Sequence, residues 1–188
     1  ISKVFNHLLA ILPFEPPYFN SVGLNTTFIG HPIIESPAMG SHSISFRKEN
    51  KILTSVKIIA VLPGSRDGEI CRHMKIFRET LIDLKKKIEN IYPVIIINKD
   101  ALSTTSKMLI DWPIPYTVIH DPKIKYNALA SADIALAASG TIALELACVG
   151  TPSIITYRIN WFSAWVIRRL VKVRFANIIN LILNREAL

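Results

Sequence analysis

Short apolar runs recur along the chain and are separated by segments with helical periodicity. Each run is too short for a helix and is bounded by turn-forming residues, a pattern typical of strands buried in a parallel sheet. The predicted strands cover residues 8–12, 57–62, 92–98, 116–120, 134–138 and 153–157.

Between the later strands, apolar residues return every three or four positions, which predicts amphipathic helices. The longest is residues 69–88, whose apolar stripe consists of Ile70, Met74, Phe77, Leu81, Leu84 and Ile88. Shorter helices are expected at residues 103–110, 123–131 and 142–149. Strands that alternate with helices in this way predict an α/β fold, here a doubly wound parallel sheet with right-handed crossovers.

The first part of the chain follows this alternation less clearly. Pro16 and Pro17 predict an extended exit from the strand at residues 8–12. Residues 23–31 are expected to form a second extended piece, and residues 32–50 are turn-rich with no clear period.

These differences suggest three parts. We expect the end of a first lobe and a linker at residues 1–50, the main lobe at residues 51–160, and further helices at residues 161–188.

Two turns at predicted strand ends carry candidate chemistry. In a parallel sheet these ends share one rim, where the start of each following helix offers free N–H groups and a positive dipole. Such turns bind phosphate. The residues concerned are Gly64, Ser65 and Arg66 in one turn and Ser139, Gly140 and Thr141 in the other.

Two charged side chains accompany these turns. Glu145 follows Thr141 by four residues, on the same helix face, and a carboxylate beside a phosphate site usually holds a ribose diol. The alternative is a solvent-facing helical Glu. Arg66 is a candidate for diphosphate binding, because a guanidinium forms paired hydrogen bonds, and its alternative is a surface arginine before a helix.

The charge of the chain indicates an acidic partner. Its 22 Lys and Arg against 14 Asp and Glu give a net charge of +8, which suits nucleotide phosphates, anionic lipid or nucleic acid. The cationic face of residues 69–88 lacks interleaved aromatic residues, so a solvated helix exterior is favoured there over a nucleic-acid surface.

Other classes of protein are less favoured. Cys71 and Cys148 lie far apart, which argues against a disulfide framework or a zinc site and fits a reducing compartment. No apolar run is long enough to cross a bilayer, and the first residues do not resemble a signal peptide.

The last segment combines tryptophans with a cluster of cations. An amphipathic helix of this composition is typical of a membrane interface. The alternative is a helix that packs on the other lobe with its cations in water. The candidate membrane-surface residues are Trp161, Trp165, Arg168, Arg169, Lys172 and Arg174.

Several motifs together resemble one family. They are ILPFEP at 11–16, FIGHP at 28–32, LPGSR at 62–66 with EI at 69–70, ALAASGT at 135–141 with LELA at 144–147, TYR at 156–158, and AWVIRRLVKVRFANIINLILNRE at 164–186. The chain resembles the lipid-A-disaccharide synthases, bacterial glycosyltransferases of the two-lobed GT-B type with Rossmann-like lobes. It departs from the family pattern at Gly68, Ile179 and Asn184, where Ser, Pro and Gly are usual.

The resemblance implies a function in lipid A biosynthesis in Gram-negative bacteria. The family transfers 2,3-diacylglucosamine from its UDP derivative to 2,3-diacylglucosamine 1-phosphate, and the products are lipid A disaccharide and UDP. It implies donor contacts by Arg66, Glu145 and Asn180, no metal or other cofactor, no nucleic acid, and a cytoplasmic protein peripheral on the inner membrane.

The resemblance also implies that the chain corresponds to the carboxy-terminal half of the family. The catalytic base is then expected in a missing amino-terminal lobe, and no catalytic residue is assigned here. On this interpretation the chain binds UDP weakly and is inactive alone. The alternatives are another UDP-sugar transferase or epimerase of the same fold, and a non-catalytic truncated remnant whose basic surface adheres to membrane.

Overall fold

A five-stranded parallel sheet forms the centre of the protein. The computed structural model describes residues 3–40, 43–156, 158, 175 and 177–186. The strand order is β5-β4-β3-β6-β7, and every neighbouring pair is parallel. The strands are β3 (Lys57–Leu62), β4 (Ile91–Ile96), β5 (Thr117–Ile119), β6 (Ile134–Ala138) and β7 (Ser153–Thr156).

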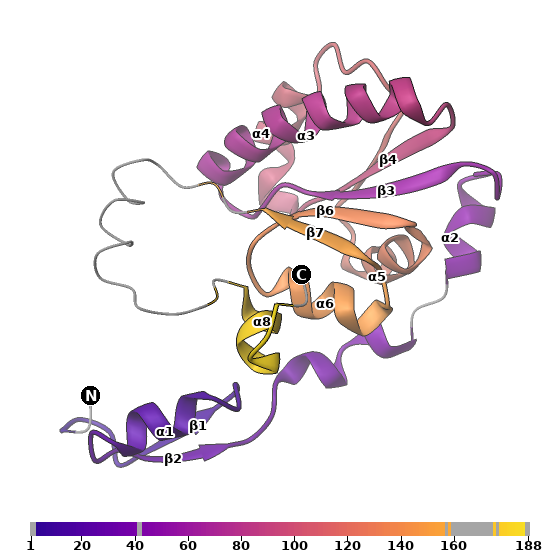
Figure 1. The fold of residues 1–188 in the computed structure, drawn as a ribbon. Helices are drawn as coiled ribbons and strands as arrows, with labels where there is room; N and C mark the ends of the chain where they lie inside the picture. The colour runs from indigo at the N-terminus through magenta and orange to yellow at the C-terminus, as the bar shows by residue number, and fades with distance from the viewer. Residues whose placement is uncertain (1–2, 41–42, 157, 159–174, 176, 187–188) are drawn as a thin grey trace.

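Helices cover both faces of this sheet, as Figure 1 shows. On one face lie α3 (Asp67–Lys87) and α4 (Leu102–Met108), and on the other lie α2 (Ser43–Glu49), α5 (Pro122–Ser131) and α6 (Ile142–Val149). Alternate residues of β3 serve the two faces, since Ile58 and Ala60 join one buried cluster and Ile59 and Val61 the other. The predicted doubly wound α/β fold is therefore confirmed.

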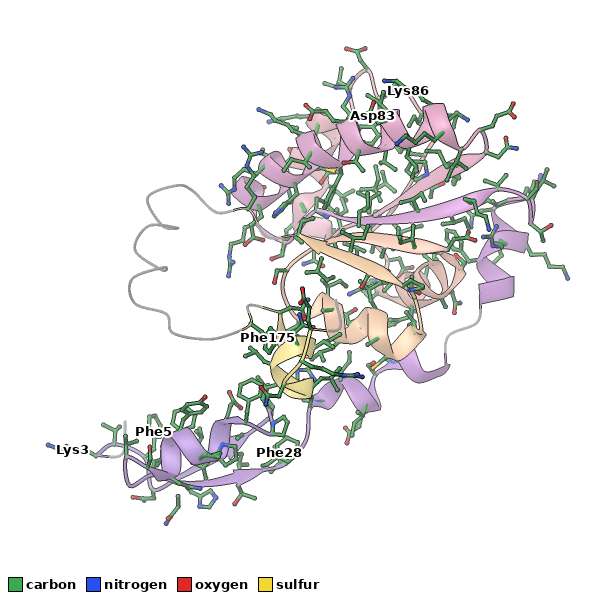
Figure 2. All side chains as sticks on the ribbon, in the orientation of Figure 1. Lys3, Phe5, Phe28, Asp83, Lys86 and Phe175 are labelled. Carbon is green, nitrogen blue, oxygen red and sulfur yellow. The ribbon has the colours of Figure 1, made fainter. Side chains whose placement is uncertain are left out.

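The long helix α3 has the predicted two-sided character. Its buried side consists of Ile70, His73, Met74, Phe77 and Leu81. Its opposite side faces solvent, where Asp83 and Lys86 form an ion pair of 2.8 Å (Figure 2).

A smaller unit precedes the sheet and lies apart from it in Figure 1. Here β1 (His7–Ala10) and β2 (Asn25–Phe28) are parallel, and α1 (Glu15–Asn20) connects them. The predicted extended exit at Pro16 and Pro17 is wrong, because both residues belong to α1 and proline occupies its first turn. Proline fits there because the amides of a first helical turn have no partner within the helix.

The segment predicted to be turn-rich contains more helix than expected. It forms two 3-10 helices, η1 (Pro32–Glu35) and η2 (Pro37–Gly40), followed by α2. The elements η1 and η2 pack against α6, and α2 packs against α5. The side chain of Phe46 on α2 is fully buried among residues of the sheet face, which explains why so short a helix is stable.

Near the carboxyl end, α8 (Ile178–Leu183) packs against α6. The Ile179 amide donates to the side chain of the N-cap residue Asn177 at 2.8 Å, a bond that proline at this position could not form. Asn184 ends the helix with φ 49°, in the left-handed region. Glycine is the usual residue for that conformation and asparagine the next most tolerant, which accounts for the departure at this position.

Candidate functional site

A pocket lies at the carboxyl ends of the central strands, where the two predicted turns meet. Leu62 of β3 pairs with Ala137 of β6, so the two turns begin side by side. The strand order reverses at this point, because β4 and β5 extend from one side of β3 whereas β6 and β7 extend from the other. Ligands of doubly wound sheets bind at such a switch point.

The pocket has a volume of about 200 Å³. Both turns and the start of α6 contribute to its wall, together with the end of β4 and one residue of α5. The lining residues are Leu62, Gly64, Ser65, Glu69, Ile96, Ile97, Asn98, Lys125, Ala138, Ser139, Gly140, Thr141, Ile142 and Glu145.

The turn after β3 is held in shape by the side chain of Glu69. Gly64 has φ 118°, and a Cβ there would lie 2.8 Å from Glu69 Oε2 and 2.9 Å from Glu69 Cβ, so only glycine fits without strain. The Ser65 amide donates to Glu69 Oε2 at 3.3 Å, and Arg66 Nη1 donates to Glu69 Oε1 at 2.9 Å.

The same contacts set the charge of Glu69. Burial by itself raises the pKa of Glu69, but the hydrogen bonds from Ser65 and Arg66 and the charge of Arg66 outweigh it, so the pKa lies below its ordinary value. The carboxylate is therefore ionised at neutral pH and holds Arg66. The Arg66 side chain is 82% exposed and does not line the pocket, although the two preceding residues, Gly64 and Ser65, do.

The turn after β6 supplies the opposite wall. The Ser139 amide donates to the Thr156 carbonyl at 2.7 Å, so it is occupied by β7 and is not available to a ligand. The amides of Gly140 and Thr141 donate to no backbone carbonyl within the described part of the chain. These two amides at the start of α6 are thus the donors that the predicted phosphate turn can offer.

Glu145 faces the pocket rather than solvent. Its side chain is 15% exposed and forms an ion pair with Lys125 of α5, with 2.5 Å between Lys125 Nζ and Glu145 Oε2. Burial raises the pKa of Tyr126. The charge of Glu145, whose carboxylate accepts a hydrogen bond from the Tyr126 hydroxyl, raises that pKa further. The interpretation of Glu145 as a solvent-facing residue is therefore wrong, because α5 covers it.

Three lining residues with polar side chains were not identified from the sequence as site residues, namely Glu69, Asn98 and Lys125. A signal existed for Glu69, because a Glu three residues after a helix N-cap commonly turns back to bind the preceding backbone. Lys125 gave no such signal, since one lysine in a short helix is most often solvated.

The remaining predicted residues lie elsewhere. Asn180 is buried on α8, next to α6, and does not line the pocket. Trp161, Trp165, Arg168, Arg169, Lys172 and Arg174 lie outside the described residues. Within the described residues no group of His, Cys, Asp and Glu could hold a metal ion, and no helix is long and apolar enough to span a membrane.

Comparisons with known proteins agree on one family. The model of the lipid-A-disaccharide synthetase family matches residues 1–188. A lipid-A-disaccharide synthase from Rhodospirillum centenum is 40% identical over 98% of this chain and 46% of its own, and one from Rickettsia bellii is 40% identical over 98% and 48%. The chain spans about half the length of these curated relatives.

A solved structure is also similar, though more weakly. The crystal structure of a glycosyl transferase family 9 protein from Veillonella parvula aligns with 75% of this chain and 45% of its own. The TM-score is 0.47 and the sequence identity 9%, so this likeness carries no argument about function.

Proposed function

Because the chain belongs to the lipid-A-disaccharide synthetase family, we propose that it is the donor-binding half of such an enzyme. The whole enzyme transfers 2,3-diacylglucosamine from its UDP derivative to 2,3-diacylglucosamine 1-phosphate and releases UDP. The observation that carries the proposal is the pocket at the switch point, where two helix-start turns and a shielded carboxylate face one cavity.

The diphosphate and the ribose of the donor each have partners in this pocket. The amides of Gly140 and Thr141 bind the diphosphate together with the Gly64 and Ser65 turn, and Arg66 reaches it from the exposed edge. Glu145 accepts hydrogen bonds from the ribose hydroxyls. Asn180, buried beside α6, supports this end of the site through α8.

The chemical contribution of this half is stabilisation of the leaving group. Negative charge builds up on the UDP oxygen as the glycosidic bond breaks, and helix-start amides and a guanidinium lower the energy of that charge. The general base that deprotonates the acceptor hydroxyl comes from an amino-terminal lobe, of which residues 1–50 are the end. The chain by itself therefore binds UDP and forms no disaccharide.

The acylated substrates place the enzyme at a lipid surface. We propose that residues 161–174, with their tryptophans and cations, contact the cytoplasmic face of the inner membrane, where anionic lipid attracts basic segments.

The proposal is tested by ligand stabilisation of this chain. At a UDP concentration ten times the Kd, the free energy of unfolding should rise by about 1.4 kcal/mol, which raises the Tm of a chain of this size by roughly 3–5 °C. ADP at the same concentration should give a smaller shift. Arg66→Ala should reduce the UDP effect, because one charge contact to the diphosphate is lost.

The matched control is Lys75→Ala, which removes one exposed cation from α3, the helix that follows Arg66, at a position away from the pocket. It should leave the UDP effect intact. No stabilisation by UDP at millimolar concentration, in the wild-type chain and Arg66→Ala alike, would favour the non-catalytic remnant.

A further inference from the structure

The charges of the pocket do not suit a diphosphate as they stand. Its charged lining residues are Glu69, Lys125 and Glu145. Glu69 is occupied by the Ser65 amide and Arg66, and Lys125 is occupied by Glu145. Each carboxylate is therefore paired with one cation, so these side chains offer an anionic ligand no net positive charge as they stand.

The ion pair between Lys125 and Glu145 is largely shielded from solvent. The two side chains are 26% and 15% exposed. Glu145 Oε2 is buried, and apart from the ion pair it has no hydrogen-bond partner among the described residues. If the ammonium left, this oxygen would need another donor, because a buried unpaired carboxylate is costly.

From this arrangement we infer that Lys125 binds the diphosphate of the donor. While the site is empty, Lys125 is paired with Glu145. When the nucleotide enters, the ammonium moves from Glu145 to the phosphate oxygens. The ribose hydroxyls then replace it as donors to Glu145. This inference rests on the proposed function, since it assigns a further contact to the same ligand.

After this exchange, both the diphosphate and the Glu145 carboxylate have partners. The diphosphate gains a cation that lies inside the pocket, whereas Arg66 approaches only from the exposed edge. Glu145 loses one cationic donor and gains two hydroxyl donors, and Tyr126 stays beside it. A ligand with ribose but no phosphate has to compete with Lys125 for Glu145, and it offers the ammonium nothing in return.

The test compares UDP with uridine on the same 188-residue chain. Calorimetry measures UDP affinity and ligand-observed NMR measures uridine affinity. Lys125→Met should weaken UDP binding by about tenfold, the size of one charge-assisted contact. Uridine affinity should be unchanged or higher. Lys125→Arg should restore most of the UDP affinity.

The matched control is Lys123→Met on the same helix, because Lys123 is exposed and does not line the pocket. Its affinities for both ligands should equal those of the wild type. Denaturation of each variant confirms that it is folded.

A second comparison separates binding from simple neutralisation of Glu145. In a Glu145→Gln background, Lys125→Met should still weaken UDP binding by about tenfold, because the ammonium contacts phosphate directly. If the loss disappears in that background, Lys125 acts only on the carboxylate and the inference is wrong.

The outcomes also separate this inference from the proposed function. If the wild type and Lys125→Met bind UDP equally tightly, the inference is wrong but the proposed function stands. Equal losses for UDP and uridine would mean that Lys125 merely orients Glu145, which also overturns it. A wild-type chain that does not bind UDP overturns both.

Discussion

At the scale of single residues, Asp133 connects two central strands at the rim opposite the pocket. Its carboxylate accepts the Ile58 amide at 2.9 Å and pairs with Arg47 at 2.9 Å and Lys57 at 3.0 Å. Burial by itself raises the pKa of Asp133, but the hydrogen bonds from Lys57 and Ile58 and the charges of Lys57 and Arg47 hold the pKa below its ordinary value.

A carboxyl whose pKa is lowered by folding stabilises the protein above its unfolded pKa, about 3.9 for Asp, and loses that contribution as pH falls through the folded pKa. Asp133→Asn should therefore cost about 1–2 kcal/mol at pH 7. The difference from the wild type should shrink as pH falls through the folded pKa, because the carboxyl then becomes protonated and its ion pairs are lost. Urea denaturation at fixed ionic strength measures it. A difference that is constant with pH would contradict the assigned role.

At the scale of the element, α3 is anchored by a histidine in its buried stripe. His73 Nδ1 donates to the Pro63 carbonyl at 2.9 Å, and Nε2 accepts the Arg158 amide at 3.4 Å. The ring thereby connects the turn after β3 with the chain beyond β7, and it stacks on Phe77.

His73→Leu keeps most of the volume but removes both hydrogen bonds. Leaving the buried Pro63 carbonyl without a partner should lower the free energy of unfolding by about 1–3 kcal/mol. His120→Leu is the control, because His120 is exposed after β5 and its replacement should be nearly neutral. Equal effects of the two substitutions in chemical denaturation would show that the bond to Pro63 contributes little.

The elements also show where sequence patterns succeed. The strands β3 and β6 were predicted with the bounds that the structure has, because a buried parallel strand is apolar on both faces and its run ends at a turn. The helices α1 and α2 were missed. The first contains two prolines and the second is short, and each depends on contacts made after folding rather than on its own periodicity.

At the scale of the whole molecule, the net charge of +8 bears on the proposed membrane contact. Each basic residue near an anionic surface contributes about 1 kcal/mol. Replacing four tail cations with Gln should therefore weaken binding to anionic vesicles by about a thousandfold. Binding of the wild type should fall as salt rises. The residues are Arg168, Arg169, Lys172 and Arg174.

A control of equal charge separates this local contact from the net charge. Four exposed lysines on other elements are replaced with Gln, namely Lys48, Lys75, Lys99 and Lys107. Vesicle sedimentation should show a small loss for this variant. If both variants lose binding equally, the attraction is general, and residues 161–174 have no special role at the membrane.

The sequence by itself determined the fold class, the central strands and the two turns that face the pocket. Each of these depends on where a side chain points relative to its own backbone, and a period of two or 3.6 residues records that directly. The need for glycine at position 64 is also local, because it follows from the positive φ of that residue's own backbone.

Only the tertiary structure decided which charges meet. It brought Lys125 of α5 against Glu145 of α6 and paired the Ser139 amide with the Thr156 carbonyl of β7. Partners of this kind lie on different elements, so their pairing follows from how those elements pack and not from any local pattern. The physical reason is that an ion pair depends on distance and burial, and both are fixed only when the chain has folded.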